Sequence, residues 1–181
     1  MSLSGSGSEP FSEPFSEPLS EPLSDLPRLA TLRLVLVPMT LDAVRALVAG
    51  ADPGLPLASG YPHADTLDAL ALQAGADEVP VAWFVVHAES GAVIGDCGAK
   101  GPPDEAGRLE IGYGLAAAYR GRGYGGEAVA AMVRWLVGQD EVRSVVAEVE
   151  VGNIASRRLL ERIGFVLDET AGGLWRFSLA R

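Results

Sequence analysis

The stretch RGRGYGG, residues 120–126, decides how this 181-residue sequence is interpreted. It lies between a predicted strand at residues 108–115 and a predicted helix at residues 127–137. Its four glycines let the backbone turn sharply and approach a ligand closely. The helix that follows begins with unpaired N–H groups and a partial positive charge. With two arginines beside that helix end, the stretch predicts a binding site for a pyrophosphate.

A dinucleotide is one pyrophosphate compound that such a turn can bind. Gly121, Gly123 and Gly126 fit the Gly-x-Gly-x-x-Gly pattern, and Glu148 follows about 20 residues later, where that motif has a ribose-binding acid. The preceding strand argues against this interpretation, because the dinucleotide motif follows a buried parallel strand with a nearly unbroken apolar run. Residues 108–115 instead contain an arginine and a glutamate. The elements before them are typical of a hairpin with an antiparallel neighbour, and not of βαβ units.

Apolar alternation, with glycine and proline between the elements, predicts the remaining secondary structure. Strands are expected at residues 31–37, 81–88, 92–99, 108–115, 142–151, 165–168 and 174–179, and helices at residues 41–48, 66–74, 127–137 and 154–163. Thr40, Asp65 or Thr66, and Asn153 are the expected helix N-caps. The order β-α-α-β-β-β-α-β-α-β-β predicts an α+β fold, with a mixed, mostly antiparallel sheet flanked by helices.

The charge is distributed unevenly between two parts of the chain. Residues 1–27 repeat Ser-Glu-Pro-Phe/Leu four times and carry half of the net charge of −10. Their regular prolines favour extended backbone, so we predict a disordered arm, or partly a tag, at residues 1–27 and one folded domain at residues 28–181. The apolar residues of the repeat are candidates for docking on a partner or a second copy: Phe11, Phe15, Leu19 and Leu23.

Composition argues against several classes of function. A net negative chain repels phosphate backbones and anionic lipids, so we expect neither nucleic-acid binding nor membrane-surface binding. No apolar run approaches the ~18 residues of a membrane span, and the first residues do not match a secretory signal. The single cysteine, Cys97, cannot form an internal disulfide, so a cytoplasmic protein is the default expectation. No metal site is predicted.

Two blocks of this sequence together resemble the GNAT superfamily of N-acetyltransferases. The first is Arg120-x-x-Gly123-x-Gly125, and the second is residues 153–165, which end in Gly-Phe. The resemblance is closest to the Rim-type branch that acetylates ribosomal-protein N-termini. It implies transfer of an acetyl group from acetyl-CoA to a primary amine by direct attack. It also implies a sheet that splays open between residues 109–115 and 142–151 to admit acetyl-CoA.

The strand before the turn supplies the candidate catalytic base. Alternation along the strand places Glu110, Gly112 and Gly114 on one face, so this carboxylate lies beside two positions without side chains. The resemblance agrees, because related enzymes place a general-base glutamate on this strand. The alternatives are a Glu110 side chain on a solvent face, or one that pairs with Arg108 or another arginine.

The resemblance also implies which residues hold acetyl-CoA. Backbone N–H groups of Leu115–Ala117 are expected to stabilise the oxyanion, and Ser156 is expected to hydrogen-bond the leaving sulfur as a second catalytic residue. Many relatives have a tyrosine general acid where this chain has Leu160, which leaves a non-catalytic acyl-CoA sensor or interaction module as the alternative. The expected cofactor-binding set is Leu115, Ala116, Ala117, Arg120, Gly121, Arg122, Gly123, Tyr124, Gly125, Gly126, Asn153, Ser156 and Arg158.

The acceptor amine is expected to belong to a small molecule or to a protein N-terminus. Tyr61 and His63 lie in the loop between the first two predicted helices, where the family usually builds its acceptor site. A homodimer is possible.

Overall fold

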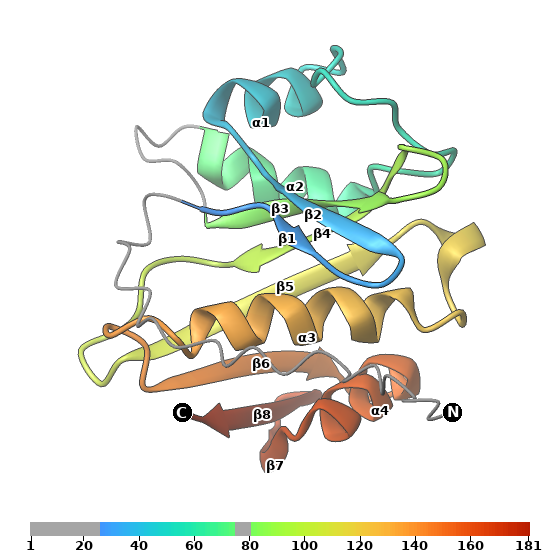
Figure 1. The fold of residues 1–181 in the computed structure, drawn as a ribbon. Coiled ribbons are helices and arrows are strands. Elements are labelled where there is room, and N and C mark those ends of the chain that lie inside the picture. Colours follow the sequence, from blue (N-terminus) through green and yellow to red (C-terminus); the bar gives the residue numbers. More distant parts are fainter. Residues whose placement is uncertain (1–25, 75–80) are drawn as a thin grey trace, which may run out of the picture.

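The computed structural model describes residues 26–74 and 81–181, which form an α+β fold (Figure 1). The strands are β1 (Leu29–Ala30), β2 (Leu34–Pro38), β3 (Ala82–His87), β4 (Val93–Ala99), β5 (Arg108–Leu115), β6 (Ser144–Glu150), β7 (Val166–Ala171) and β8 (Leu174–Ala180). The helices are α1 (Leu41–Val48), α2 (Ala64–Ala74), α3 (Tyr124–Leu136) and α4 (Ile154–Ile163), with a 3₁₀ turn, η1, at Ala117–Tyr119. The predicted fold class is confirmed.

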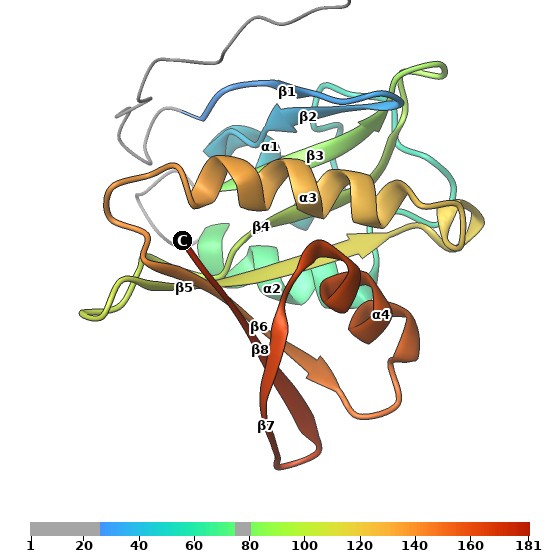
Figure 2. The same cartoon turned by 60° about the horizontal axis from the view of Figure 1, so that its bottom comes forward.

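The eight strands form one sheet in the order β1-β2-β3-β4-β5-β6-β8-β7. Every neighbouring pair in it is antiparallel except β5 and β6, which run parallel. Figure 2 shows β5 and β6 starting side by side and then parting along their length. The sheet is therefore mixed and mostly antiparallel, as predicted, and it opens at its one parallel pair.

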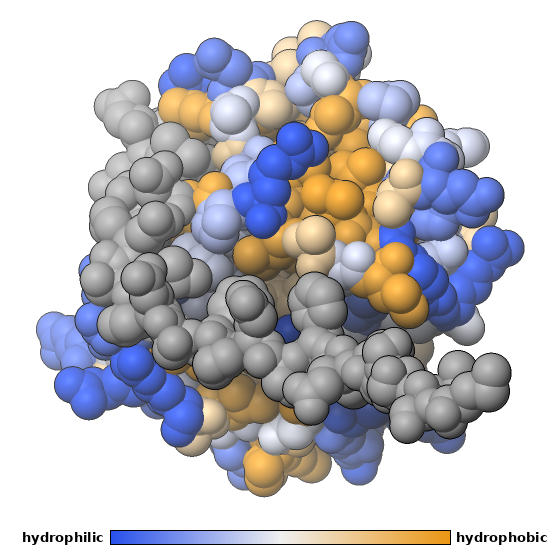
Figure 3. Space-filling model, in the orientation of Figure 1, coloured by the Kyte–Doolittle hydropathy of each residue, from blue (hydrophilic) through white to orange (hydrophobic). Residues whose placement is uncertain are grey.

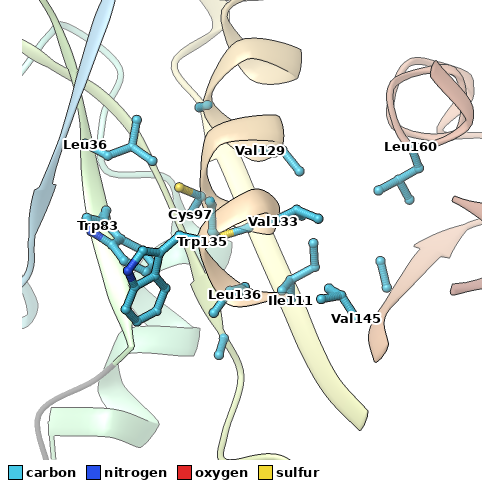
Figure 4. Close-up of a cluster of buried hydrophobic side chains, with 14 of the residues drawn as sticks. Leu36, Trp83, Cys97, Ile111, Val129, Val133, Trp135, Leu136, Val145 and Leu160 are labelled. Atoms are coloured by element: carbon cyan, nitrogen blue, oxygen red, sulfur yellow. The ribbon is translucent and has the colours of Figure 1, made fainter. Parts of the chain in front are cut away.

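Helices cover both faces of the sheet, with α3 and α4 on one face and α1 and α2 on the other (Figures 1 and 2). The larger core lies under α3, where Val129, Val133 and Leu136 point towards Ile111 and Val145 of the strands (Figure 4). All five are at most 4% exposed. A second core joins α1 and α2 to β3 and β4. The three tryptophans are buried core residues: Trp83, Trp135 and Trp175.

Several element boundaries differ from the sequence prediction. The short strand β1 was not predicted, and it pairs with β2. Helix α3 begins at Tyr124, three residues before the predicted start, because glycine is tolerated in a first turn whose N–H groups have no intrahelical partner. Helix α2 begins at Ala64, so the predicted cap Thr66 lies inside the helix, where its hydroxyl bonds a side chain instead of capping.

One βαβ unit begins at β5, the strand that precedes the glycine-rich turn. Strand β5, helix α3 and strand β6 form a βαβ unit, because β5 and β6 are parallel neighbours. The pairing that precedes it is antiparallel, as expected, through β3, β4 and β5. The glycine-rich turn thus lies at the start of a crossover helix, but in a sheet that is otherwise antiparallel.

The start of the described chain is attached to the larger core. Leu26 packs against it, and the Pro27 carbonyl accepts a hydrogen bond of 2.8 Å from the Trp83 indole. The predicted arm up to residue 25, with its four candidate docking residues, lies outside the described residues.

The surface carries an apolar area over β2 and α1, seen as orange in the upper part of Figure 3. A groove of about 350 Å³ lies there, lined mainly by apolar residues of β2, β3 and the segment after α1. Within residues 26–74 and 81–181, no helix has the length and apolar character needed to cross a membrane.

Candidate active site

The opening between β5 and β6 is the central feature of the candidate site. The two strands pair over three positions only, and the last joins Glu110 to Val146. Beyond Glu110, β5 continues to Leu115 without β6 beside it. A bulge in β4 lies next to the end of β5, and there the Ile94 carbonyl accepts the Ala116 N–H at 2.8 Å. The edge of β5 from Ile111 to Leu115 therefore borders an open wedge in the sheet.

The glycine-rich turn lies at the end of β5 and leads into α3. Gly123 is the N-cap of the helix at φ +83°, a left-handed conformation that other residues adopt only with strain, and no side chain caps the helix. The first-turn N–H groups of α3 therefore have no side-chain acceptor at the cap. Added side chains at Gly121 and Gly126 would meet open space. The Arg120 guanidinium donates to the Leu115 carbonyl at 2.8 Å, which ties the turn to the end of β5.

Arg33 is a further cation at this turn that the sequence prediction missed. Its guanidinium lies over the Tyr124 ring at 4.4 Å and donates to the Arg122 carbonyl at 3.0 Å. It also forms an ion pair of 2.7 Å with Glu127 in the first turn of α3. Since β2 and α3 are far apart in sequence, no local motif could have indicated this contact. The turn thus has three arginines beside a helix N-terminus.

The carboxylate of Glu127 links the β1–β2 hairpin to α3. It accepts from the Thr31 hydroxyl at 2.6 Å, from the Arg33 N–H at 2.7 Å and from the Arg33 guanidinium at 2.8 Å. Burial alone would raise the pKa of Glu127, but these hydrogen bonds outweigh it and hold the pKa below its usual value. A lowered pKa means that the charged form stabilises the folded state.

Glu127→Gln is expected to lower the free energy of unfolding at pH 7 by about 1.5–3 kcal/mol, the usual range for hydrogen bonds to a charged group. The stabilisation is present above the unfolded-state pKa near 4.3 and disappears as the pH falls through the lower folded-state value. Denaturant unfolding of both proteins at pH 7 and pH 3 measures this. A difference that does not shrink at pH 3 would contradict it.

The second sequence block begins α4 on the other side of the opening. The Asn153 side chain caps the helix by accepting the Ser156 N–H at 3.1 Å, as predicted. The Ser156 and Tyr113 hydroxyls share a hydrogen bond of 2.6 Å, which joins α4 to β5 across the opening. Burial raises the pKa of Tyr113, although its bond to Ser156 lowers it in part. Tyr113 was not among the predicted site residues, and Leu160 is fully buried in the core.

Two arginines of the second sequence block, Arg157 and Arg158, lie on the surface of α4. Arg158 is exposed on α4. Arg157 pairs with Glu161 at 2.8 Å, one turn further along the helix, and lies over the Trp175 ring at 4.9 Å.

Glu110, Gly112 and Gly114 share the face of β5 opposite α3, as the alternation predicted. The Glu110 carboxylate forms an ion pair of 2.5 Å with Lys100, whereas an arginine was the predicted alternative partner. Lys100 also lies 3.6 Å from where a side chain on Gly112 would begin. This ion pair does not exclude a base role, because the Glu110 side chain is 36% exposed.

An open groove of about 590 Å³ extends from Glu110 across the uncovered face of β5, β6 and β8. Five carboxylates and three cations line it, so its lining has a net negative charge. Arg176 holds two of these carboxylates, Glu148 at 2.8 Å and Glu169 at 2.9 Å. The charged lining residues are Lys100, Asp104, Arg108, Glu110, Glu148, Asp168, Glu169 and Arg176.

Gly112 and Gly114 form a strip of β5 without side chains, here called the glycine strip, and Glu110 lies at one end of it. The predicted acceptor residues Tyr61 and His63 lie at its other end. The His63 ring is 3.6 Å from where a side chain on Gly114 would begin, and its Nε2 lies 3.4 Å from the Arg120 guanidinium. The Tyr61 ring is buried and meets His63 edge-on at 6.2 Å. The structure therefore brings Glu110 and His63 to opposite ends of one strip of β5.

Asp96, on β4 beside Gly114, is a carboxylate that the sequence prediction missed. It accepts the Thr66 hydroxyl at 3.0 Å. Burial raises the pKa of Asp96 to about 6, although Thr66, Tyr61 and the charge of His63 each lower it. The available signal was a lone acid in a strand of otherwise apolar and small residues, AVIGDCGA.

The sequence profile of a known family aligns with most of these elements. Residues 33–166 match the family described as the "Acetyltransferase (GNAT) domain", a span that holds the opened strands, the glycine-rich turn and α4. The chain belongs to the GNAT acetyltransferase family. The predicted recognition is thereby confirmed.

Known GNAT relatives are similar to this chain in sequence or in fold. The uncharacterized N-acetyltransferase YjdG of Bacillus subtilis (strain 168) is 33% identical over 86 residues, which are 48% of this chain and 51% of that protein. The chain thus spans about half the length of the curated relatives that it matches.

Two solved structures show the same fold. A putative GNAT-family acetyltransferase from Bordetella pertussis has a TM-score of 0.64 at 22% identity, covering 86% of this chain and 100% of that chain. RimL, a ribosomal L7/L12 alpha-N-protein acetyltransferase in complex with coenzyme A, has a TM-score of 0.59 at 17% identity, covering 85% of this chain and 98% of that chain.

Proposed function

We propose that this chain transfers the acetyl group of acetyl-CoA to a primary amine. The observation that carries the proposal is the wedge between β5 and β6, which has a glycine-rich turn and the uncapped N-terminus of α3 at its end. Membership of the GNAT family supports this reaction. The likeness to a RimL structure that holds coenzyme A supports the choice of donor.

The donor is expected to bind in two parts. The N–H groups of the first turn of α3, together with Arg120, Arg122 and Arg33, suit the pyrophosphate, because a helix N-terminus and arginines both favour anions. Asn153 and Ser156 at the start of α4 would hold the pantetheine arm. The Ala116 N–H already bonds the Ile94 carbonyl, so the predicted oxyanion role falls to its neighbours Leu115 and Ala117.

The acceptor is expected to enter from the groove on the opposite face. Glu110 lies at the end of this groove and beside the open part of β5, where it would act as general base. The negative lining favours an amine carried on a cationic molecule or a protein N-terminus. The shared hydrogen bond of Tyr113 and Ser156 lies across the wedge, where a hydroxyl would protonate the leaving thiolate. A cytoplasmic location and a homodimer stay predictions.

Transfer is tested by incubating the full chain with acetyl-CoA and a panel of primary amines. The panel holds a polyamine, an aminoglycoside, free amino acids and short peptides with free N-termini. Release of free thiol, matched by a mass increase of one acetyl group on the amine, would support the proposal. Saturable acetyl-CoA binding with no acetylated product from any class would favour the acyl-CoA sensor.

Gly126→Glu tests the donor site. Gly126 lies in the first turn of α3 and faces open space, so a glutamate fits there but places a negative charge beside the expected pyrophosphate. At an effective dielectric near 20, this repulsion is worth about 1.4 kcal/mol or more, so we expect the Kd for acetyl-CoA to rise about tenfold or more.

Gly126→Ala is the matched control. It should leave the Kd unchanged and raise the free energy of unfolding by roughly 0.5–1 kcal/mol, the helix-propensity difference between glycine and alanine. Calorimetric titration of the three proteins decides the matter. Equal affinities for acetyl-CoA in wild type and Gly126→Glu would place the pyrophosphate elsewhere.

A further inference from the structure

Acetylation of an alkylammonium requires that the nitrogen lose two protons. The first must leave before the nitrogen has a lone pair, and the second must leave after the C–N bond has formed. Glu110 alone accounts for one of these transfers. The other needs a second proton acceptor on the acceptor side of β5. The inference below rests on the proposed acetyl transfer.

Asp96 supplies a negative charge, and His63 a basic ring nitrogen, at the end of the glycine strip that lies farther from Glu110. Asp96 is opposite Gly114 in the β4–β5 pairing, and the His63 ring lies over the same glycine. Glu110 lies four residues earlier on the same face. The glycine strip is therefore flanked by a carboxylate at one end and by a histidine with a carboxylate at the other.

The contacts of His63 define which of its nitrogens can accept a proton. An arginine guanidinium can only donate, so the 3.4 Å contact from Arg120 marks Nε2 as the nitrogen that carries the lone pair. The distance makes this a weak contact, which an incoming ammonium can replace. The negative charge of Asp96 lies close enough to interact with His63.

We propose that His63 and Asp96 form a pair that receives the ammonium of the acceptor and takes the first of its two protons. His63 is the group that touches the acceptor, and Asp96 is a positioning residue that stabilises the protonated ring. The freed lone pair then forms the C–N bond, and the C–S bond breaks. Glu110 takes the second proton. One proton ends on the thiolate, giving the free thiol, and the other passes to water.

The surroundings of Asp96 support this role. The groups that face it are Tyr61, His63 and Thr66, and Arg120 lies behind His63. The Tyr61 hydroxyl is buried without a hydrogen-bond partner among the described residues, although it lies near the Asp96 carboxylate. Burial raises the pKa of Asp96 to about 6. A buried carboxylate with a raised pKa lowers the free energy of unfolding at neutral pH. Strongly shifted pKa values of this kind are typical of functional sites.

The experiment compares wild type with Asp96→Asn and His63→Gln, using the amine that the panel shows to be acetylated fastest. Both variants should lower kcat/KM for the amine about tenfold or more and alter the acid limb of its pH profile. The Kd for acetyl-CoA should stay within about twofold. Asp140→Asn, an exposed acid paired with Arg181 at 3.5 Å, is the control and should leave all three quantities unchanged.

The melting temperature of Asp96→Asn separates a functional role of Asp96 from a structural one. Because the pKa of Asp96 is raised on folding, its charge destabilises the folded state at neutral pH, and Asp96→Asn should melt at a higher temperature than wild type at pH 7.5. This gain should fade below pH ~4, where the carboxyl is protonated in both states. A lower melting temperature at pH 7.5 would make Asp96 a structural residue and overturn the proposal.

The interaction between His63 and Asp96 can also be measured without acetyl transfer, so that its test does not depend on the proposed function. Carbon NMR of the Asp96 carboxyl should give a higher pKa in His63→Gln than in wild type, because the histidine charge now lowers it. An unchanged pKa would overturn the pair. Absence of acetyl transfer in wild type, with the Asp96 shift observed, would instead count against the proposed function.

Discussion

Glu110→Gln is expected to lower kcat by about 10²–10⁴-fold, the usual contribution of a general acid–base group. The amide keeps the size of the side chain and can still accept from Lys100, but it cannot take a proton. The face of β5 that carries Glu110 lies opposite the face that packs under α3, so the Kd for acetyl-CoA should change by no more than about twofold. The folded state should be affected little, because a half-exposed ion pair contributes about 0–1 kcal/mol.

Steady-state kinetics with a fixed amine, together with calorimetric titration of acetyl-CoA, measure both quantities. Glu89→Gln makes the same chemical change at an exposed position in the β3–β4 turn and should leave kcat as in wild type. A kcat for Glu110→Gln within about twofold of wild type would reduce Glu110 to the partner of Lys100. That result would leave the His63–Asp96 pair as the base.

Gly95→Val is expected to destabilise the fold by more than about 4 kcal/mol, the range reached by severe overpacking and backbone displacement. Gly95 lies opposite Leu115, beside the bulge in β4. A side chain there would begin against the Gly114 carbonyl oxygen, far closer than the 3.0 Å that real side chains respect. That atom is backbone and cannot rotate away, so β4 and β5 would have to part where β5 enters the wedge.

Denaturant unfolding of Gly95→Val and Gly101→Ala gives the comparison. Gly101 lies in the exposed loop after β4, has open space around it, and should accept alanine with a change of no more than about 0.5 kcal/mol. Gly95→Ala, if it stays folded, should bind acetyl-CoA more weakly because Leu115 is displaced. A Gly95→Val protein with nearly wild-type stability would show that the close approach of these strands is not needed.

The fold was predictable because its local signals are strong. The glycine stretch at residues 120–126 marks the start of α3, and the alternation in β5 correctly placed Glu110 on the face of Gly112 and Gly114. Asn153 was recognised as a cap from its residue type and from the apolar stripe that follows. Each of these signals lies within one element and the turn beside it, where sequence spacing translates directly into geometry.

The missed site residues depend on contacts between distant segments. Arg33 reaches the glycine-rich turn only because β2 lies beneath α3, and Lys100 meets Glu110 only because β4 pairs with β5. Asp96 carried a local signal, an acid within an apolar strand, but its partner Thr66 comes from another element. The opening between β5 and β6 was implied by the resemblance, and their parallel pairing was not predicted because no local pattern indicates it.

The most direct test of the account is a calorimetric titration of the full chain with acetyl-CoA, run beside an identical titration with NADH. The wedge between β5 and β6 with its uncapped helix predicts saturable binding of one acetyl-CoA per chain and no binding of NADH. Binding of NADH in preference to acetyl-CoA, or no heat from acetyl-CoA at any concentration, would contradict the proposed donor site and with it the proposed reaction.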